Sequence, residues 1–265
     1  GQLDRTFRDP AREMRVIDYY LCWNDLIPDT INYFAGVVKR ASGGDKTVGT
    51  YYWYFLDFLG SVEMGHNAGH RILADSPNVD YVMQSPTYYD RDLGAGADYS
   101  RRPHLSGTLN GKILYYDNDN ASFRSPTVLK RMAERYPDSP YIQSFESTEA
   151  MVEFTVRSMS IPSTAQQTIW QWERNAGMVL ADGLYESFFD LHGGYFDHPR
   201  LLAELRSIRL LLERSVQYDR SSVAEVLVVV DEASQAYLPL PFVSADDFTA
   251  NPRISWALMQ FQPAF

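Results

Sequence analysis

Two carboxylates, Asp117 and Asp119, stand one residue apart directly after an apolar and aromatic run over residues 111–116. Successive side chains of a β-strand point to opposite faces, so both carboxylates should leave the strand end on the same side, where a parallel barrel opens to substrate. Paired carboxylates are the groups with which sugar-cleaving barrels work. A simple turn is the alternative, because Asp and Asn after a strand also hydrogen-bond their own backbone.

Aromatic and basic side chains at other strand ends are candidates for binding a substrate. Trp53 and Tyr54 could stack on the C–H face of a sugar ring, or they could pack in the core. Tyr89 and Arg91 follow another expected strand, and the guanidinium of Arg91 could orient a carboxylate or a sugar hydroxyl. A structural salt bridge is the alternative for Arg91.

Further acidic and imidazole groups lie near the candidate site or at spacings that occur in metal sites. Glu186 and Asp190 flank the end of a late strand, where one of them could face the cleft, although Asp190 could equally cap the glycine-rich loop that follows. His66 and His70 would share one face of a helix, with Glu63 three residues earlier, but this spacing alone is a weak metal motif. We expect no metal site and no cofactor, and we assign His70 to the rim of the substrate site.

Strands and helices alternate along the chain. Strands are expected over 47–54, 78–86, 112–116 and 183–189, and helices over 11–40 (in two pieces, interrupted at 24–28), 67–74, 125–136, 148–159, 165–181 and 201–216. A long polar loop, 88–110, separates the second and third strands. This alternation predicts an α/β fold with parallel strands joined by helical crossovers.

Composition limits the classes of protein and partner. The chain has 265 residues, of which 45% are apolar, and a formal charge of −10. This charge disfavours nucleic acid and anionic membranes as partners. We expect a soluble chain of undecided compartment, since no run is long enough to span a membrane and no signal peptide is recognisable. The single cysteine, Cys22, has apolar neighbours and is expected to be buried.

The character of the sequence changes near residue 220. Residues 223–230 form a continuous apolar run, typical of a fully buried strand. We therefore expect a first domain over 1–219 and the beginning of a second α/β domain over 220–265.

A series of short motifs suggests a family. In chain order they are Phe7–Pro10, Val48–Tyr54, Gly69-His70, Val79–Arg91, Gly111–Asn120 and Phe189–Phe196. Their order and spacing resemble the family 42 β-galactosidases and related retaining glycoside hydrolases with a (β/α)8 barrel. The resemblance implies a TIM barrel of which strands five to eight are present, followed by an α/β domain that relatives often use for trimer contacts. A homo-oligomer, or a second chain that completes the barrel, is thus an expected partner.

The resemblance also implies roles for individual residues. The family nucleophile, usually Glu, falls on Asp117, and the second acid of that motif falls on Asp119, whereas the acid/base residue is expected upstream of Gly1. Asp is one methylene shorter than Glu, which matters because a retaining enzyme needs its two carboxyl groups about 5 Å apart. The resemblance thus implies a hydrolase that acts on a β-linked, galactoside-like carbohydrate.

Two other functions remain open. The first is a barrel relative that binds carbohydrate without hydrolysing it, which the change from Glu to Asp favours. The second is an unrelated α/β enzyme that handles phosphate or nucleotides. The latter is disfavoured, because neither the P-loop motif nor the dinucleotide-binding glycine motif is present.

Overall fold

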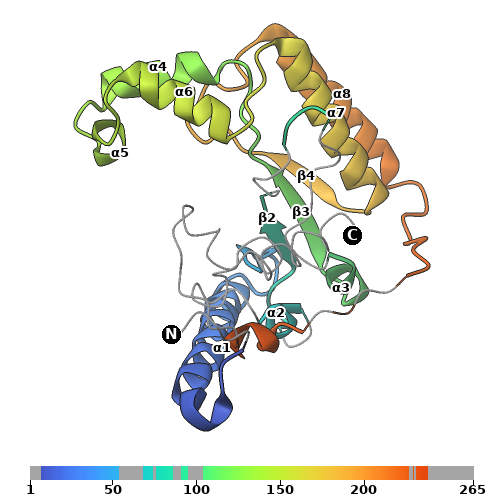
Figure 1. Ribbon diagram of the computed structural model, residues 1–265. Coiled ribbons are helices and arrows are strands. Elements are labelled where there is room, and N and C mark those ends of the chain that lie inside the picture. Colours follow the sequence, from blue (N-terminus) through green and yellow to red (C-terminus); the bar gives the residue numbers. More distant parts are fainter. Residues whose placement is uncertain are drawn as a thin grey trace. The chain divides into compact units, whose positions relative to one another are not determined.

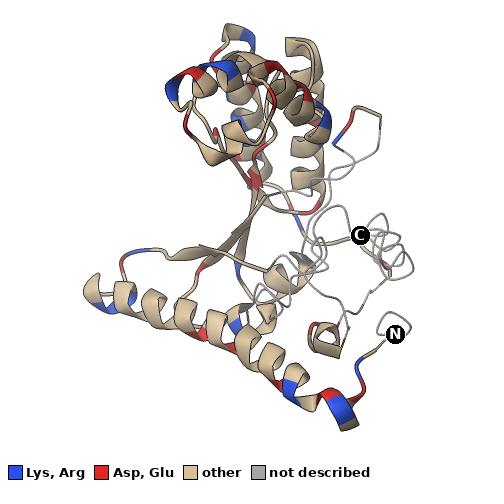
Figure 2. Ribbon diagram, turned by 60° about the vertical axis from the view of Figure 1, so that its left-hand side comes forward, with Lys and Arg blue, Asp and Glu red and all other residues tan. Residues whose placement is uncertain are grey.

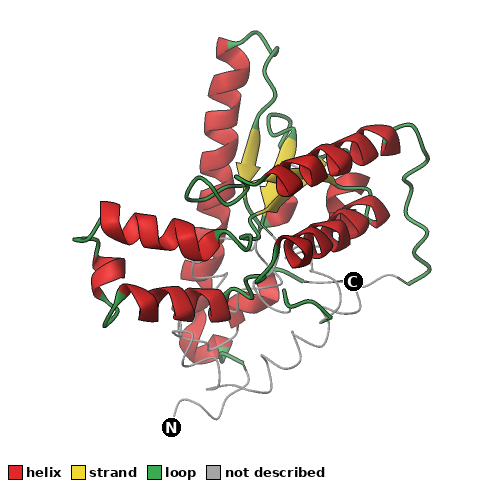
Figure 3. Cartoon of the chain, turned by 90° about the horizontal axis from the view of Figure 1, so that it is seen from above, coloured by secondary structure: helices red, strands yellow, loops and turns green. Residues whose placement is uncertain are grey.

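The computed structural model describes residues 7–53, 68–73, 76–85, 91–94, 104–226, 229 and 231–237. The elements, drawn in Figures 1 and 3, are α1 (Pro10–Ala41), β1 (Gly49–Tyr51), α2 (Gly69–Leu73), β2 (Tyr81–Gln84), α3 (His104–Leu109), β3 (Ile113–Asn118), α4 (Ser125–Arg135), α5 (Pro140–Gln143), α6 (Thr148–Ser158), α7 (Ala165–Ala181), β4 (Tyr185–Phe188), α8 (Pro199–Ser215) and the 3-10 helix η1 (Ala233–Tyr237). The chain divides into two compact units. Unit 1 holds the described residues of 1–84, 99–115 and 223–265, and unit 2 holds those of 85–98 and 116–222. The predicted domain boundary between 219 and 220 stays a prediction.

A four-stranded parallel sheet confirms the predicted α/β fold. The strand order is β1-β2-β3-β4, and Gly49 pairs with Tyr81 and Tyr51 with Met83 where β1 meets β2. Each strand overlaps the range expected for it. The described residues do not show a closed (β/α)8 barrel.

Unit 2 takes its core from packed helix pairs. In the first, α7 and α8 lie side by side around the fully buried Trp172 and Leu201 (Figure 1). In the second, α4 and α6 enclose Leu129 and Met151. Helix α7 begins where sequence rules expect it, because the Thr164 hydroxyl accepts a hydrogen bond from the backbone N–H of Gln167 at 3.2 Å.

Unit 1 is built on the long helix α1. Ile17 of α1 is fully buried and packs against Ala236 of η1. Arg71 of α2 forms ion pairs with two aspartates on successive turns of α1, Asp25 and Asp29. In Figure 2, acidic and basic residues are interspersed along this helix.

Helix α1 is continuous, so the predicted interruption at 24–28 is wrong. Pro28 lies inside the helix and is buried, although proline removes one backbone hydrogen bond. The buried positions Ile17, Asn24, Pro28 and Ala35 fall on one helical face, because their spacings of seven, four and seven residues match whole helical turns. Packing of this face outweighs the lost bond. Cys22 lies off that face and is exposed, which corrects its expected burial.

Three further differences concern loops and the apolar run. The expected loop 88–110 contains the short helix α3, and α5 was not anticipated. The strand expected over 223–230 is wrong for its described residues, because 223–226 and 229 have no strand structure. Val223 is 94% exposed, so its apolar character does not reflect burial.

Among the described helices, none has the length and apolarity needed to cross a membrane.

Candidate functional site

The register between β3 and β4 determines which side chains meet near the ends of these strands. The backbone N–H of Phe189 donates to the Asn118 carbonyl at 3.0 Å. In a parallel ladder this bond sets Ser187 beside Asp117 and Phe188 beside Asn118. Because side chains alternate, Asp117 and Ser187 share one face of the sheet, and Asn118, Glu186 and Phe188 share the other.

Asp117 is held by a hydroxyl from the neighbouring strand. The Ser187 hydroxyl donates to Oδ1 of Asp117 at 2.6 Å, a short bond of the kind that carboxylates accept. Asp117 is buried, with 4% of its surface exposed. The pair therefore presents one oriented carboxylate on its face of the sheet, with a hydroxyl beside it.

Glu186 is a half-buried acid on the opposite face. The side-chain amide of Asn118 donates to its Oε1 at 2.9 Å, whereas its Oε2 is buried without a hydrogen-bond partner in the described part of the chain. Burial raises the pKa of Glu186 to about 7, although the bond from Asn118 acts in the other direction. The neighbouring Phe188 packs edge-on against Trp172 of α7, so this face of the strand points toward the helix.

Asp119 lies beyond the strand end in a buried ion pair. Arg91 donates to Oδ1 of Asp119 at 2.7 Å, and Arg91 is only 1% exposed. Helix α7 holds Arg91 in place, because the Gln171 side-chain amide donates to its carbonyl at 2.9 Å. The structure thus shows the salt bridge that was the alternative for Arg91.

A turn follows the strand, and the side chain of Asn118 forms its characteristic bond. The side-chain oxygen of Asn118 accepts the backbone N–H of Asn120 at 3.2 Å, as in an Asx turn. Asn118 therefore links the turn to Glu186 through the two ends of its amide. Its type and place directly after Asp117 were the only sequence signals for this role.

Asp190 caps the loop that follows β4. Its carboxylate accepts the backbone N–H groups of Gly194 at 2.7 Å and of Tyr195 at 3.1 Å. This is the alternative stated for Asp190. Tyr195 is buried, so these bonds anchor the loop to the core of unit 2.

Trp53 and His70 belong to unit 1 and meet at a glutamate. The Trp53 indole N–H donates to Glu232, and Nδ1 of His70 lies 2.9 Å from Oε2 of Glu232. Trp53 is buried and has a positive φ of 75°, so its surroundings hold it in place. This agrees with core packing, the alternative to stacking on a sugar ring. Glu232 was not among the expected site residues. Its place next to Asp231, after the apolar run, gave no sign of this contact.

The remaining candidates lie outside the described residues, namely Tyr54, Tyr89, Glu63 and His66. Among the residues that are described, no group of three or more His, Cys, Asp or Glu side chains is arranged to hold a metal ion. Of the predicted site, unit 2 therefore contains Asp117, Asp119, Arg91, Glu186 and Asp190.

Comparison of the chain with protein-family models, with curated proteins and with solved structures found no match.

Proposed function

We propose that this chain carries the second half of a (β/α)8 barrel of a retaining, β-galactosidase-like glycoside hydrolase. The observation that carries the proposal is the buried Asp117 carboxylate near the carboxyl end of β3, held by the Ser187 hydroxyl at 2.6 Å. A nucleophile must be oriented toward its target, and the hydrogen bond from the Ser187 hydroxyl fixes the orientation of the Asp117 carboxylate.

The strand order supports the same proposal. A doubly wound sheet reverses its strand order at a switch point, whereas successive barrel strands are always neighbours. The order β1-β2-β3-β4 contains no reversal. It is the order that four consecutive strands of a barrel would have.

In the proposed reaction, one oxygen of Asp117 attacks the anomeric carbon as the aglycone oxygen leaves with the bonding electrons. Water then hydrolyses the resulting glycosyl ester. The Ser187 hydroxyl stays hydrogen-bonded to Oδ1 of Asp117 and keeps the carboxylate oriented. Asp119 and Arg91 keep the adjoining turn in place through their ion pair.

A second candidate function is carbohydrate binding without hydrolysis. It is favoured by the position of Glu186, because this acid lies on the opposite face of the sheet from Asp117. A protonated Glu186 therefore does not serve as the acid partner of Asp117.

Covalent trapping distinguishes the two functions. A 2-deoxy-2-fluoro-β-galactoside with a dinitrophenolate leaving group needs no proton donor, and its fluorine slows hydrolysis of the ester. We expect mass spectrometry of digested protein to locate the fluorosugar on Asp117, and Asp117→Asn to remove the label. Asp119→Asn, the matched control, should still be labelled. If the sugar binds in a calorimeter but no peptide is labelled, the chain is a binding protein, and a label on another carboxylate would refute Asp117 as nucleophile.

A further inference from the structure

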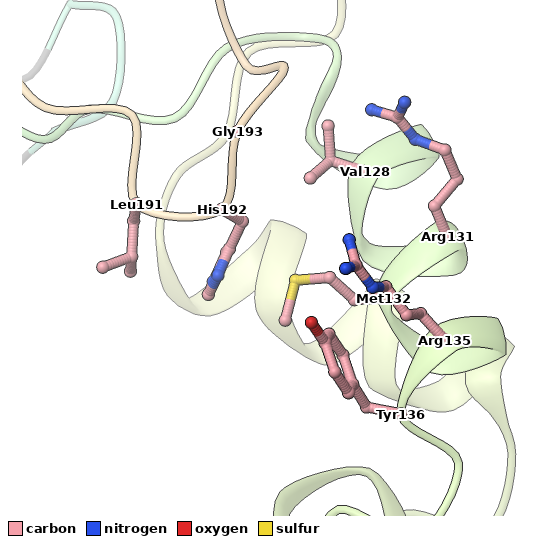
Figure 4. A pocket seen from close by; sticks show the side chains of 8 residues that line it. All are labelled: Val128, Arg131, Met132, Arg135, Tyr136, Leu191, His192 and Gly193. Atoms are coloured by element: carbon pink, nitrogen blue, oxygen red, sulfur yellow. The ribbon is translucent and has the colours of Figure 1, made fainter.

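A cavity of about 450 Å³ in unit 2 lies between α4 and the loop that follows β4 (Figure 4). Helix α4 contributes Arg131, Met132 and Arg135, and the loop contributes Leu191 and His192. The volume is in the range of small-molecule sites. None of the residues that line it belongs to the Asp117, Asp119 or Glu186 contacts described above.

Two guanidinium groups give this cavity its charge. Arg131 and Arg135 stand four residues apart and so lie on the same face of α4. Within the described residues neither has a carboxylate partner, whereas Arg209 of α8 pairs with Glu213 over the same spacing. Like charges at this spacing destabilise a helix, and a bound anion would remove that repulsion. A positive cavity in a chain of net charge −10 therefore favours an anionic ligand.

Side chains of several kinds converge on the cavity. In Figure 4 the guanidinium of Arg135, the hydroxyl of Tyr136 and the sulfur of Met132 point toward the space in front of His192. Burial lowers the pKa of His192, although Asp190 acts in the other direction, and this favours the neutral imidazole. The apolar side chains of Met132 and Leu191 offer a surface for the body of a ligand.

Hydrogen bonds hold the loop that lines one side of the cavity. The Asp190 carboxylate accepts the backbone N–H groups of Gly194 and Tyr195 and so holds the loop in this conformation. A Cβ at Gly194 would lie 2.7 Å from Nη2 of Arg131. The loop backbone and the Arg131 guanidinium are thus in close contact.

We propose that this cavity binds a small organic anion, with a phosphate or carboxylate held by Arg131 and Arg135 and a sugar-sized body lying on Met132 and Leu191. Planar guanidinium groups bind such oxyanions with two parallel hydrogen bonds. The proposal is independent of the hydrolase function.

Calorimetry of the full chain at constant ionic strength tests the proposal with inorganic phosphate, glucose 6-phosphate, glucuronate and neutral glucose as probes. We expect the anionic probes to bind and glucose not to bind. If glucose 6-phosphate binds more tightly than glucuronate, the head group is a phosphate; the reverse order identifies a carboxylate. Failure of all three anions to bind at 10 mM, about the weakest affinity that such a site would show, overturns the proposal.

A charge-matched pair of variants tests the position of the site. The double variant Arg131→Gln/Arg135→Gln should weaken binding at least about tenfold, whereas Lys130→Gln/Arg157→Gln removes the same charge from α4 and α6 outside the cavity and should change it less than about twofold. Equal weakening by both doubles would show that only net charge attracts the anion, which contradicts the proposal. Arg135→Gln alone provides the same comparison, against Lys130→Gln, if the double variant does not fold.

Discussion

Replacing Glu186 by Gln should stabilise the protein at alkaline pH and leave it unchanged in acid. The wild-type carboxyl is buried, and its Oε2 has no partner in the described part of the chain. Gln keeps the oxygen that accepts from Asn118 and carries no charge, so it resembles the protonated acid.

The size and sign of the effect follow from proton linkage. Burial raises the pKa of Glu186 from 4.5 to about 7 on folding. Below pH 4.5 the carboxyl is protonated in both the folded and the unfolded chain, so its burial does not reduce the free energy of unfolding. Between pH 4.5 and 7 the unfolded chain releases its proton while the folded chain retains it, so the free energy of unfolding falls as pH rises. The total loss above pH 7 is about 3 kcal/mol, at 1.36 kcal/mol per pKa unit.

Urea denaturation of wild type and Glu186→Gln at pH 4.5, 6, 7 and 8 measures this loss. We expect the two proteins to agree at pH 4.5 and to differ by about 3 kcal/mol at pH 8, with Glu186→Gln the more stable. Glu153→Gln, a change at an exposed acid of α6, is the control and should show no such difference. A Glu186→Gln protein that is less stable by the same amount at every pH would mean that the buried group is ionised and satisfied, contrary to our reasoning.

Three further outcomes follow from the geometry of unit 2. Asp117→Asn should reduce turnover of an activated aryl β-galactoside by several orders of magnitude but barely change the melting temperature, because an amide oxygen still accepts from the neighbouring serine hydroxyl. Asp119→Ala should cost about 3 kcal/mol in urea denaturation, because it removes an acceptor from a buried guanidinium. Gly194→Ala should cost about 2 kcal/mol in the same assay, because its φ of +103° is a backbone conformation that alanine adopts only with strain. Gly177→Ala, inside α7 with nothing within 4 Å of the new Cβ, should instead gain about 0.5 kcal/mol.

Elements that are decided by local chemistry could be predicted from the sequence. Helix α7 begins and ends at the residues expected, because the Thr164 cap and the apolar period act within a few residues of each other. Helices α4 and α6 begin at the expected residues, Ser125 and Thr148, and each ends one residue earlier than expected. The parallel sheet followed from the alternation of strands and helices.

Features that depend on tertiary packing could not be predicted in this way. Pro28 is a helix breaker by local rules, yet burial of one face of α1 carries the helix through it. Residues 223–226 read as a buried strand, but burial is a property of what surrounds a segment, and Val223 and Val226 are exposed. Glu232 contacts His70, which lies 162 residues earlier in the chain, and Ser187 contacts Asp117, which lies 70 residues earlier. Local sequence rules do not predict contacts over such separations.

The register of β3 against β4 decides which chemistry the carboxyl end of the sheet can perform. A shift of β4 by one residue would exchange the faces of Ser187 and Phe188, and the hydroxyl of Ser187 would then meet the amide of Asn118 instead of the proposed nucleophile. The contact of Phe188 with the buried Trp172 opposes such a shift, since Phe188 would have to leave the core of α7 and α8. The orientation of the candidate nucleophile therefore depends on an aromatic contact on the opposite face of the strand.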